Sequence, residues 1–166
     1  MDVQISYLFS RRPKFLSKVI ALGAKYSISE LRHSSKIPSH TAYLINNRYV
    51  VESVFEGGYR VLSYNKWKEI NELIAVVPAG TRTMTYLKEK TRKFEGRSYD
   101  MWGALYLAMC VALKIFFRIP IPKHNRLHKP HQYFCCELIG ELEGKDYAMK
   151  SPAKVMLHVQ KKYTTV

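Results

Sequence analysis

The residue of this sequence best suited to act as a nucleophile is a cysteine near the end of the chain. The segment FCCELIGEL, residues 134–142, predicts a helix with Cys135 in its first turn. Free amide groups and the positive end of the helix dipole stabilise a thiolate there and lower the pKa of its thiol. Cys135 is therefore a candidate nucleophile. The alternative interpretation is a small buried thiol that packs the start of the helix.

A cysteine nucleophile needs a base, and His40 is the histidine whose position favours that role. It begins a predicted strand directly after a polar loop, so its ring can be held rigidly and still face a cleft. Glu52 follows on the next strand of a predicted hairpin, residues 41–45 and 48–54, that turns at Asn46-Asn47. That register places Glu52 roughly opposite His40, where its carboxylate can orient the imidazole, although a slip of one residue would turn it to the other face.

The elements that must position these residues can be read from hydrophobic periodicity and turn signals. Residues 73–78 form a continuous apolar run, the pattern of a fully buried strand. Residues 118–130 contain three prolines and should be irregular. The remaining predicted elements are strands at 3–9, 41–45, 48–54 and 59–63, a turn or short helix at 67–71, and helices at 13–25, 83–94, 99–117, 134–142 and from Ser151-Pro152 onward. This order predicts an α+β fold, with residues 1–166 forming a single domain.

The composition is that of a folded, strongly basic protein. Of the 166 residues, 47% are hydrophobic and 13% aromatic, which excludes a disordered chain, and three cysteines do not make a disulfide framework. Lysine and arginine number 27 against 13 acidic residues, giving a net charge of +14. Such a charge favours anionic partners, but the basic residues are scattered, so solubility with weak anion attraction is the simpler interpretation.

No secretory signal opens the chain, since Met1 is followed by an acidic residue and the first arginines come too late. We therefore expect synthesis in the cytoplasm, with incorporation in a virion as one route of export. The longest apolar stretch, residues 101–117, is interrupted by Lys114 and falls short of the roughly 20 residues that span a bilayer. It predicts a buried or membrane-grazing helix.

The ordered set of motifs resembles the circularly permuted branch of the NlpC-type papain-like cysteine hydrolases, which includes the YiiX-like and lecithin retinol acyltransferase-like proteins. The matching segments are SHTAYLI (39–45), YVVESVFEGGYRVLSYNKW (49–67), FEGRSYDMWGAL (94–105), FCCELIGEL (134–142) and SPAKVM (151–156). The histidine precedes the cysteine, which is the permuted order. The resemblance implies a permuted papain-like fold over residues 1–166, with a small antiparallel sheet or half-barrel packed against helices.

The same resemblance implies a catalytic triad and a reaction. Cys135 matches the nucleophile, His40 the general base and Glu52 the residue that orients it, while Cys136 stands where serine is common and is expected to pack the helix. The implied mechanism is acyl transfer through a thioester, with the backbone N–H of Cys135 as an oxyanion donor. No cofactor and no metal are expected.

The resemblance permits several substrates. We favour amide bonds of peptidoglycan peptides, because a small basic cell-wall hydrolase without a signal is typical of bacteriophages. Hydrolysis or transfer of lipid acyl groups is the alternative, since an apolar helix and a basic loop directly precede Cys135. Peptidoglycan or another anionic envelope polymer, a lipid surface and virion proteins are the corresponding partners.

Three other interpretations compete with an enzyme. A zinc site could use His124, His128, His131, Cys135 and Cys136, but Pro130 interrupts any helix there and no C-x-x-C pair exists. Nucleic-acid binding would suit the charge and the aromatic residues, yet no recognisable motif is present and the aromatics lie in apolar runs, so this partner is disfavoured. A non-catalytic virion component of the same fold is the third.

Overall fold

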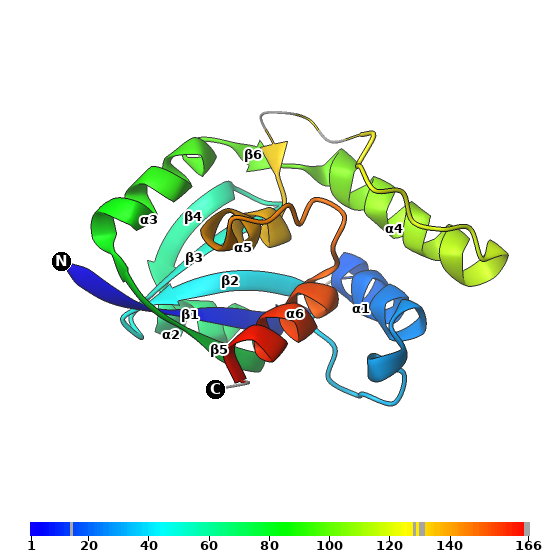
Figure 1. Ribbon diagram of the computed structural model, residues 1–166, viewed down its shortest axis with the longest axis horizontal. Helices are drawn as coiled ribbons and strands as arrows, with labels where there is room; N and C mark the ends of the chain where they lie inside the picture. Colours follow the sequence, from blue (N-terminus) through cyan, green and yellow to red (C-terminus); the bar gives the residue numbers. More distant parts are fainter. Residues whose placement is uncertain (14, 128, 130–131, 165–166) are drawn as a thin grey trace.

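A five-stranded antiparallel sheet forms the centre of the molecule, with the strand order β4-β3-β2-β1-β5 (Figure 1). The computed structural model describes residues 1–13, 15–127, 129 and 132–164. All strand pairings within this sheet are antiparallel and the helices pack outside it, so the class is α+β, as predicted. The elements are β1 (Asp2–Arg11), α1 (Phe15–Ser27), η1 (Ser29–Leu31), β2 (His40–Ile45), β3 (Tyr49–Val54), β4 (Gly58–Ser63), α2 (Tyr64–Ile70), β5 (Glu72–Thr83), α3 (Met84–Thr91), η2 (Arg92–Phe94), β6 (Ser98–Tyr99), α4 (Met101–Phe117), β7 (Gln132–Tyr133), α5 (Cys135–Glu143) and α6 (Pro152–Thr164).

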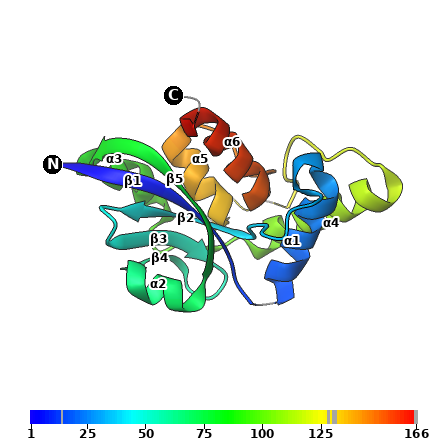
Figure 2. The ribbon, with the colours of Figure 1, turned by 90° about the horizontal axis from the view of Figure 1, so that it is seen from below.

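Helices cover both faces of the sheet. Side chains alternate along each strand, so the central strands can place apolar residues on both faces. On one face lie α5 and α6, and on the other lies α2 (Figure 2). The larger core includes Tyr7, Phe9 and Tyr43 and extends to the buried side of α5. The smaller core, under α2, is formed by Leu8, Ala42, Leu44, Val50 and Trp67. The central strands therefore carry apolar residues on both sides.

The β2–β3 hairpin has a register one residue away from the predicted one. Ile45 pairs with Tyr49, so the loop holds three residues, and Asn46 and Asn47 adopt left-handed φ angles of 48° and 54°. Glu52 consequently pairs with Ala42 rather than lying opposite His40. His40 is two residues from Ala42, and an offset of two keeps a side chain on the same face. The predicted pairing was wrong in detail, but the shared face was right.

Strand β5 is not the fully buried strand that its apolar run predicted. It is the edge strand of the sheet and pairs only with β1 among the strands of the described residues. Leu73 and Val76 are 36% and 43% exposed. An apolar run records the absence of polar side chains and carries no information about the number of neighbouring strands.

A short parallel pair of strands ties the start of α4 to the start of α5. Tyr99 of β6 pairs with Tyr133 of β7, and the N–H of Asp100 donates to the Tyr133 carbonyl at 3.0 Å. The Asp100 carboxylate then caps α4 by accepting from the N–H of Gly103 at 2.8 Å. From this junction α4 extends beyond the sheet beside α1 (Figure 1). Among the described residues, no helix combines the length and apolar character required to traverse a bilayer.

Gly58 offers a test of the contact between β4 and the segment that leads into β6. A Cβ atom there would overlap the carbonyl oxygen of Arg97, whereas a Cβ at Gly144, which has the same φ of +63°, would meet nothing within 4 Å. We expect Gly144→Ala to lower the free energy of unfolding by about 1 kcal/mol through backbone strain alone. Gly58→Ala should cost about 2–4 kcal/mol, because overlap adds to strain. Equal losses in urea unfolding would contradict the close approach.

Candidate active site

The structure brings together the three residues that the sequence singled out. Cys135 is the first residue of α5, His40 the first of β2, and Glu52 lies within β3. Helix α5 packs directly on β2, which carries the sulfur to the end of the strand where His40 lies. All three are buried, at 3%, 7% and 0% exposure.

His40 lies between the other two and contacts both of them. Its Nε2 is 2.7 Å from Oε2 of Glu52. A hydrogen bond also joins the ring of His40 to the thiol of Cys135. Because Nε2 is engaged by the carboxylate, Nδ1 is the ring nitrogen available to the sulfur. This is the sulfur–imidazole–carboxylate chain expected of a cysteine nucleophile with an oriented base.

The pKa values of the pair favour a thiolate beside an imidazolium. Burial disfavours a charged imidazole, but the hydrogen bonds from His40 to Cys135 and Glu52 outweigh burial and raise the pKa of His40 to about 9. The pKa of Cys135 lies well below the ordinary thiol value, through a hydrogen bond with Cys136 and, against the effect of burial, through His40 and the N–H of Thr41. Transfer of the thiol proton from Cys135 to His40 is thus favoured.

Cys136 differs from its neighbour in environment. It is fully buried, and burial raises the pKa of its thiol well above the ordinary value, with the hydrogen bond to Cys135 acting in the same direction. A neutral Cys136 can donate its S–H to the Cys135 sulfur. The expectation that Cys136 packs the helix agrees with its burial but did not include this hydrogen bond.

Glu52 is held by more donors than the sequence indicated. Its Oε2 also accepts from Nε1 of Trp67 at 2.9 Å. Its Oε1 accepts from Nη2 of Arg12 at 3.0 Å and from Nε of Arg60 at 2.8 Å. Burial would raise the pKa of Glu52, but the hydrogen bond and charge of His40, together with the guanidinium groups, hold it at about 2.

These supporting residues were not identified from the sequence. Arg60 pairs directly with Glu52 across the β3–β4 hairpin, and the Gly57-Gly58 turn could have predicted that these two residues lie opposite each other. Arg12 directly follows β1 and Trp67 lies in α2, and no local pattern relates either of them to Glu52.

An apolar cavity of about 430 Å³ lies between α1 and α4 and reaches Cys135. Its inner end includes Ser39, Tyr99 and Phe134 beside the thiol. The long walls are aliphatic and small side chains of the two helices: Val19, Ile20, Leu22, Gly23, Ala24, Ala104, Leu107, Ala108, Val111, Ala112 and Ile115. A volume in this range, roughly 300–1,000 Å³, is typical of pockets that hold small molecules.

The residues of the competing zinc interpretation are only partly described. His128 and His131 lie outside the described residues, and within the described ranges no cluster of three His, Cys, Asp or Glu side chains could hold a metal ion. His124 is exposed, whereas Cys135 is engaged with His40.

No family model, curated protein or solved structure matches the chain.

Alkylation by iodoacetamide tests the ion pair, because only the thiolate reacts. Cys135 should react at about pH 6, where an ordinary thiol with a pKa of about 8.5 is almost entirely protonated. His40→Ala removes the imidazolium and should lower the rate at that pH by at least about tenfold, moving the reactivity midpoint upward. Peptide mass spectrometry identifies the modified cysteine. Modification of Cys136 instead, or a midpoint unchanged by His40→Ala, would contradict the assignment.

Glu52→Gln tests the buried carboxylate. The amide keeps the size of the side chain but leaves two guanidinium groups without their counter-charge, so we expect a loss of about 3–5 kcal/mol in the free energy of unfolding. The control Glu72→Gln removes a half-exposed partner of Arg11 and should cost less than about 1 kcal/mol. Since the folded pKa of Glu52 lies below its ordinary 4.5, the wild type should lose this stabilisation as pH falls from 4.5 toward 2, and Glu52→Gln should not.

Proposed function

We propose that this protein is a cysteine acyl hydrolase or acyltransferase that works through a thioester on Cys135 and takes its acyl group from a lipid. The observation that supports this proposal most strongly is the position of the thiol, hydrogen-bonded to His40 at the inner end of an apolar cavity. The resemblance to permuted papain-like hydrolases agrees with this chemistry.

The first half of the reaction forms the thioester. The Cys135 thiolate attacks the carbonyl carbon of an ester or amide, and the carbonyl π electrons move onto oxygen. The N–H of Cys135 lies at the first position of α5, where no acceptor within the helix exists, so it can donate to that oxyanion. As the oxyanion collapses, the bond to the alcohol or amine breaks, and the His40 imidazolium gives its proton to the leaving group.

The second half returns the enzyme to its starting state. Neutral His40 accepts a proton from water or an alcohol, whose oxygen attacks the thioester and releases the acid or a new ester. The thiolate leaves and the imidazolium is restored. Glu52 stabilises the positive charge on the ring throughout and holds its orientation, because its own pKa of about 2 keeps it ionised.

The cavity favours an aliphatic acyl group over a peptide. Its walls between α1 and α4 are almost entirely carbon, so an amide backbone placed there would lose its hydrogen bonds to water. A methylene chain gains about 0.8 kcal/mol for each CH₂ group buried. The tail of the substrate would extend away from Cys135 along the two helices.

Cleavage of peptidoglycan peptides, which the sequence favoured, is the second candidate. The net charge of +14 supports it, because an anionic envelope polymer would be attracted to the whole surface. In this case the peptide would approach Cys135 without using the depth of the cavity.

Turnover of p-nitrophenyl esters of increasing chain length separates the two candidates. With a lipid acyl substrate, kcat/KM should rise from acetate to longer esters by up to about fourfold per methylene until the cavity is filled. Cys135→Ala should abolish turnover and the covalent acyl adduct seen by intact-protein mass spectrometry. Ala108→Phe should reduce the ratio of long-chain to acetate turnover, because Ala108 lines the cavity.

The result that would favour the second candidate is equally specific. It is Cys135-dependent release of new amino groups from purified peptidoglycan, with no dependence of ester turnover on chain length. Absence of both activities would overturn the proposed function.

A further inference from the structure

The outer face of α4 is apolar where a helix exposed to water is normally polar. Trp102, Leu105, Met109 and Phe116 are 48–78% exposed. Their spacing of three, four and seven residues places them on one side of the helix, and Phe117 extends this side at 70% exposure. Contiguous exposed apolar surface of this kind marks an interaction site.

Exposed apolar residues continue onto α1, next to the cavity. Val19, Leu22 and Tyr26 are 39%, 54% and 58% exposed, and they repeat with helical spacing. These three residues and Phe116 also line the cavity that leads to Cys135. The cavity therefore opens within this apolar surface.

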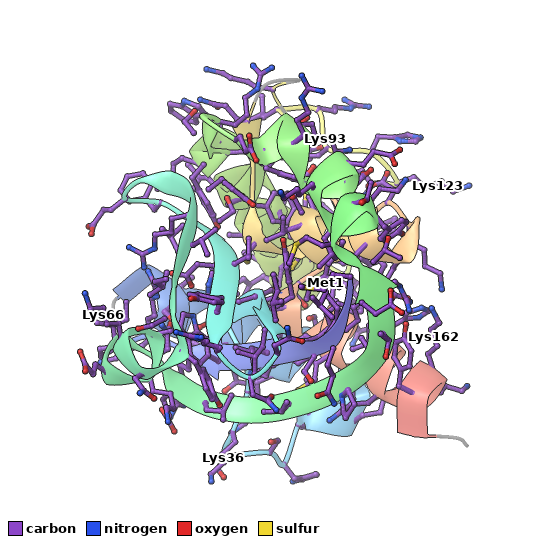
Figure 3. The ribbon with its side chains drawn as sticks, turned by 90° about the vertical axis from the view of Figure 1, so that its left-hand side faces the viewer. Met1, Lys36, Lys66, Lys93, Lys123 and Lys162 are labelled. Atoms are coloured by element: carbon purple, nitrogen blue, oxygen red, sulfur yellow. The ribbon has the colours of Figure 1, made fainter. Side chains whose placement is uncertain are left out.

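Basic side chains lie on the same two helices and on the loop that follows α4. In the sequence, neither residues 3–29 nor residues 101–136 contain an aspartate or glutamate. Where the structure describes these two segments, the exposed lysines and arginines are Lys18, Lys114, Arg118, Lys123, Arg126 and Lys129. Lys123 projects from the loop beside α4, far from Lys66 on the opposite side of the molecule (Figure 3). Exposed apolar residues on segments that carry positive and no negative side chains are complementary to an anionic lipid surface, which offers acyl chains and phosphate groups.

We propose that the surface formed by these exposed residues of α1 and α4, together with the basic side chains of Arg118, Lys123, Arg126 and Lys129, docks on an anionic lipid bilayer. In the docked state Trp102 and Phe116 lie at the boundary between headgroups and acyl chains, and the lysines and arginines reach the phosphates with their aliphatic stems along the apolar surface. The mouth of the cavity then faces the lipid directly. This inference extends the proposed function by supplying a route for an acyl chain, but the docking itself needs no catalysis.

Vesicle flotation with full-length Cys135→Ala protein tests the docking without turnover. The probe is an extruded vesicle of phosphatidylcholine, with or without phosphatidylglycerol. We expect binding at least about tenfold tighter with the anionic lipid, weakened by added salt. Equal binding to both vesicles, or none to either, would overturn the proposal.

Matched substitutions test whether this surface is the one that binds. Trp102→Ser and Phe116→Ser should each weaken binding at least about tenfold, whereas Val61→Ser, at another exposed apolar position on β4, should not. Reversing charge with Lys123→Glu should reduce binding about fivefold or more, and Lys66→Glu on α2 should have a clearly smaller effect. Circular dichroism and melting curves establish that each variant is folded. Equal effects of Lys123→Glu and Lys66→Glu would indicate diffuse attraction and overturn the assignment.

Tryptophan fluorescence gives a direct readout of insertion. Trp102 is 54% exposed and Trp67 is fully buried, and the sequence contains no other tryptophan. Emission from Trp102 should shift to shorter wavelength on anionic vesicles and be quenched by brominated lipid, and the Trp102→Ser variant should lose both changes. Vesicle docking without ester or amide turnover would defeat the proposed function alone, whereas turnover of soluble esters without docking would defeat this inference alone.

Discussion

A buried negative charge is the constraint on which the rest of the site depends. Glu52 has no exposed surface, and an unpaired carboxylate in that position would cost several kcal/mol, on the order of the whole stability of a small protein. The fold meets this requirement by bringing donors to one point from β2, β4, α2 and the residue that follows β1. The orientation of His40 follows from this convergence. The same interactions that make the carboxylate tolerable also prepare the imidazole to hold a proton.

Reactivity at Cys135 is then set by two neighbours with opposite properties. His40 supplies positive charge, and Cys136, whose own thiol is kept neutral by burial, supplies a hydrogen-bond donor. Two identical side chains that follow one another in the sequence thus take different protonation states. The first position of the helix faces the strand end, and the second faces the interior. Helix geometry, with 100° between successive residues, is sufficient to separate them.

Much of this arrangement follows from patterns in the sequence, and the exceptions have physical reasons. The helix start at Cys135, the hairpin and the shared face of His40 and Glu52 depend on local spacing, which a sequence records directly. The exact pairing in the hairpin could not be predicted from local spacing, because Asn46 and Asn47 suit a loop of two residues as well as the observed loop of three. Non-local features were inaccessible. The approach of Arg12 and Trp67 to Glu52, and the cavity between α1 and α4, require the packing of elements that are distant in the chain.

The joint between β6 and β7 has a mechanical consequence for the cavity. The N–H of Asp100 donates a hydrogen bond to the carbonyl of Tyr133, two residues before Cys135, so α4 is anchored to the main chain that carries this cysteine. A rigid rod fastened at one end moves most at its free end. A rotation of α4 away from α1 about its anchored end would therefore widen the cavity at Phe116 and leave the width of the cavity beside the Cys135 sulfur almost unchanged. The outer end of the cavity can therefore change in width while the end at Cys135 keeps a constant width.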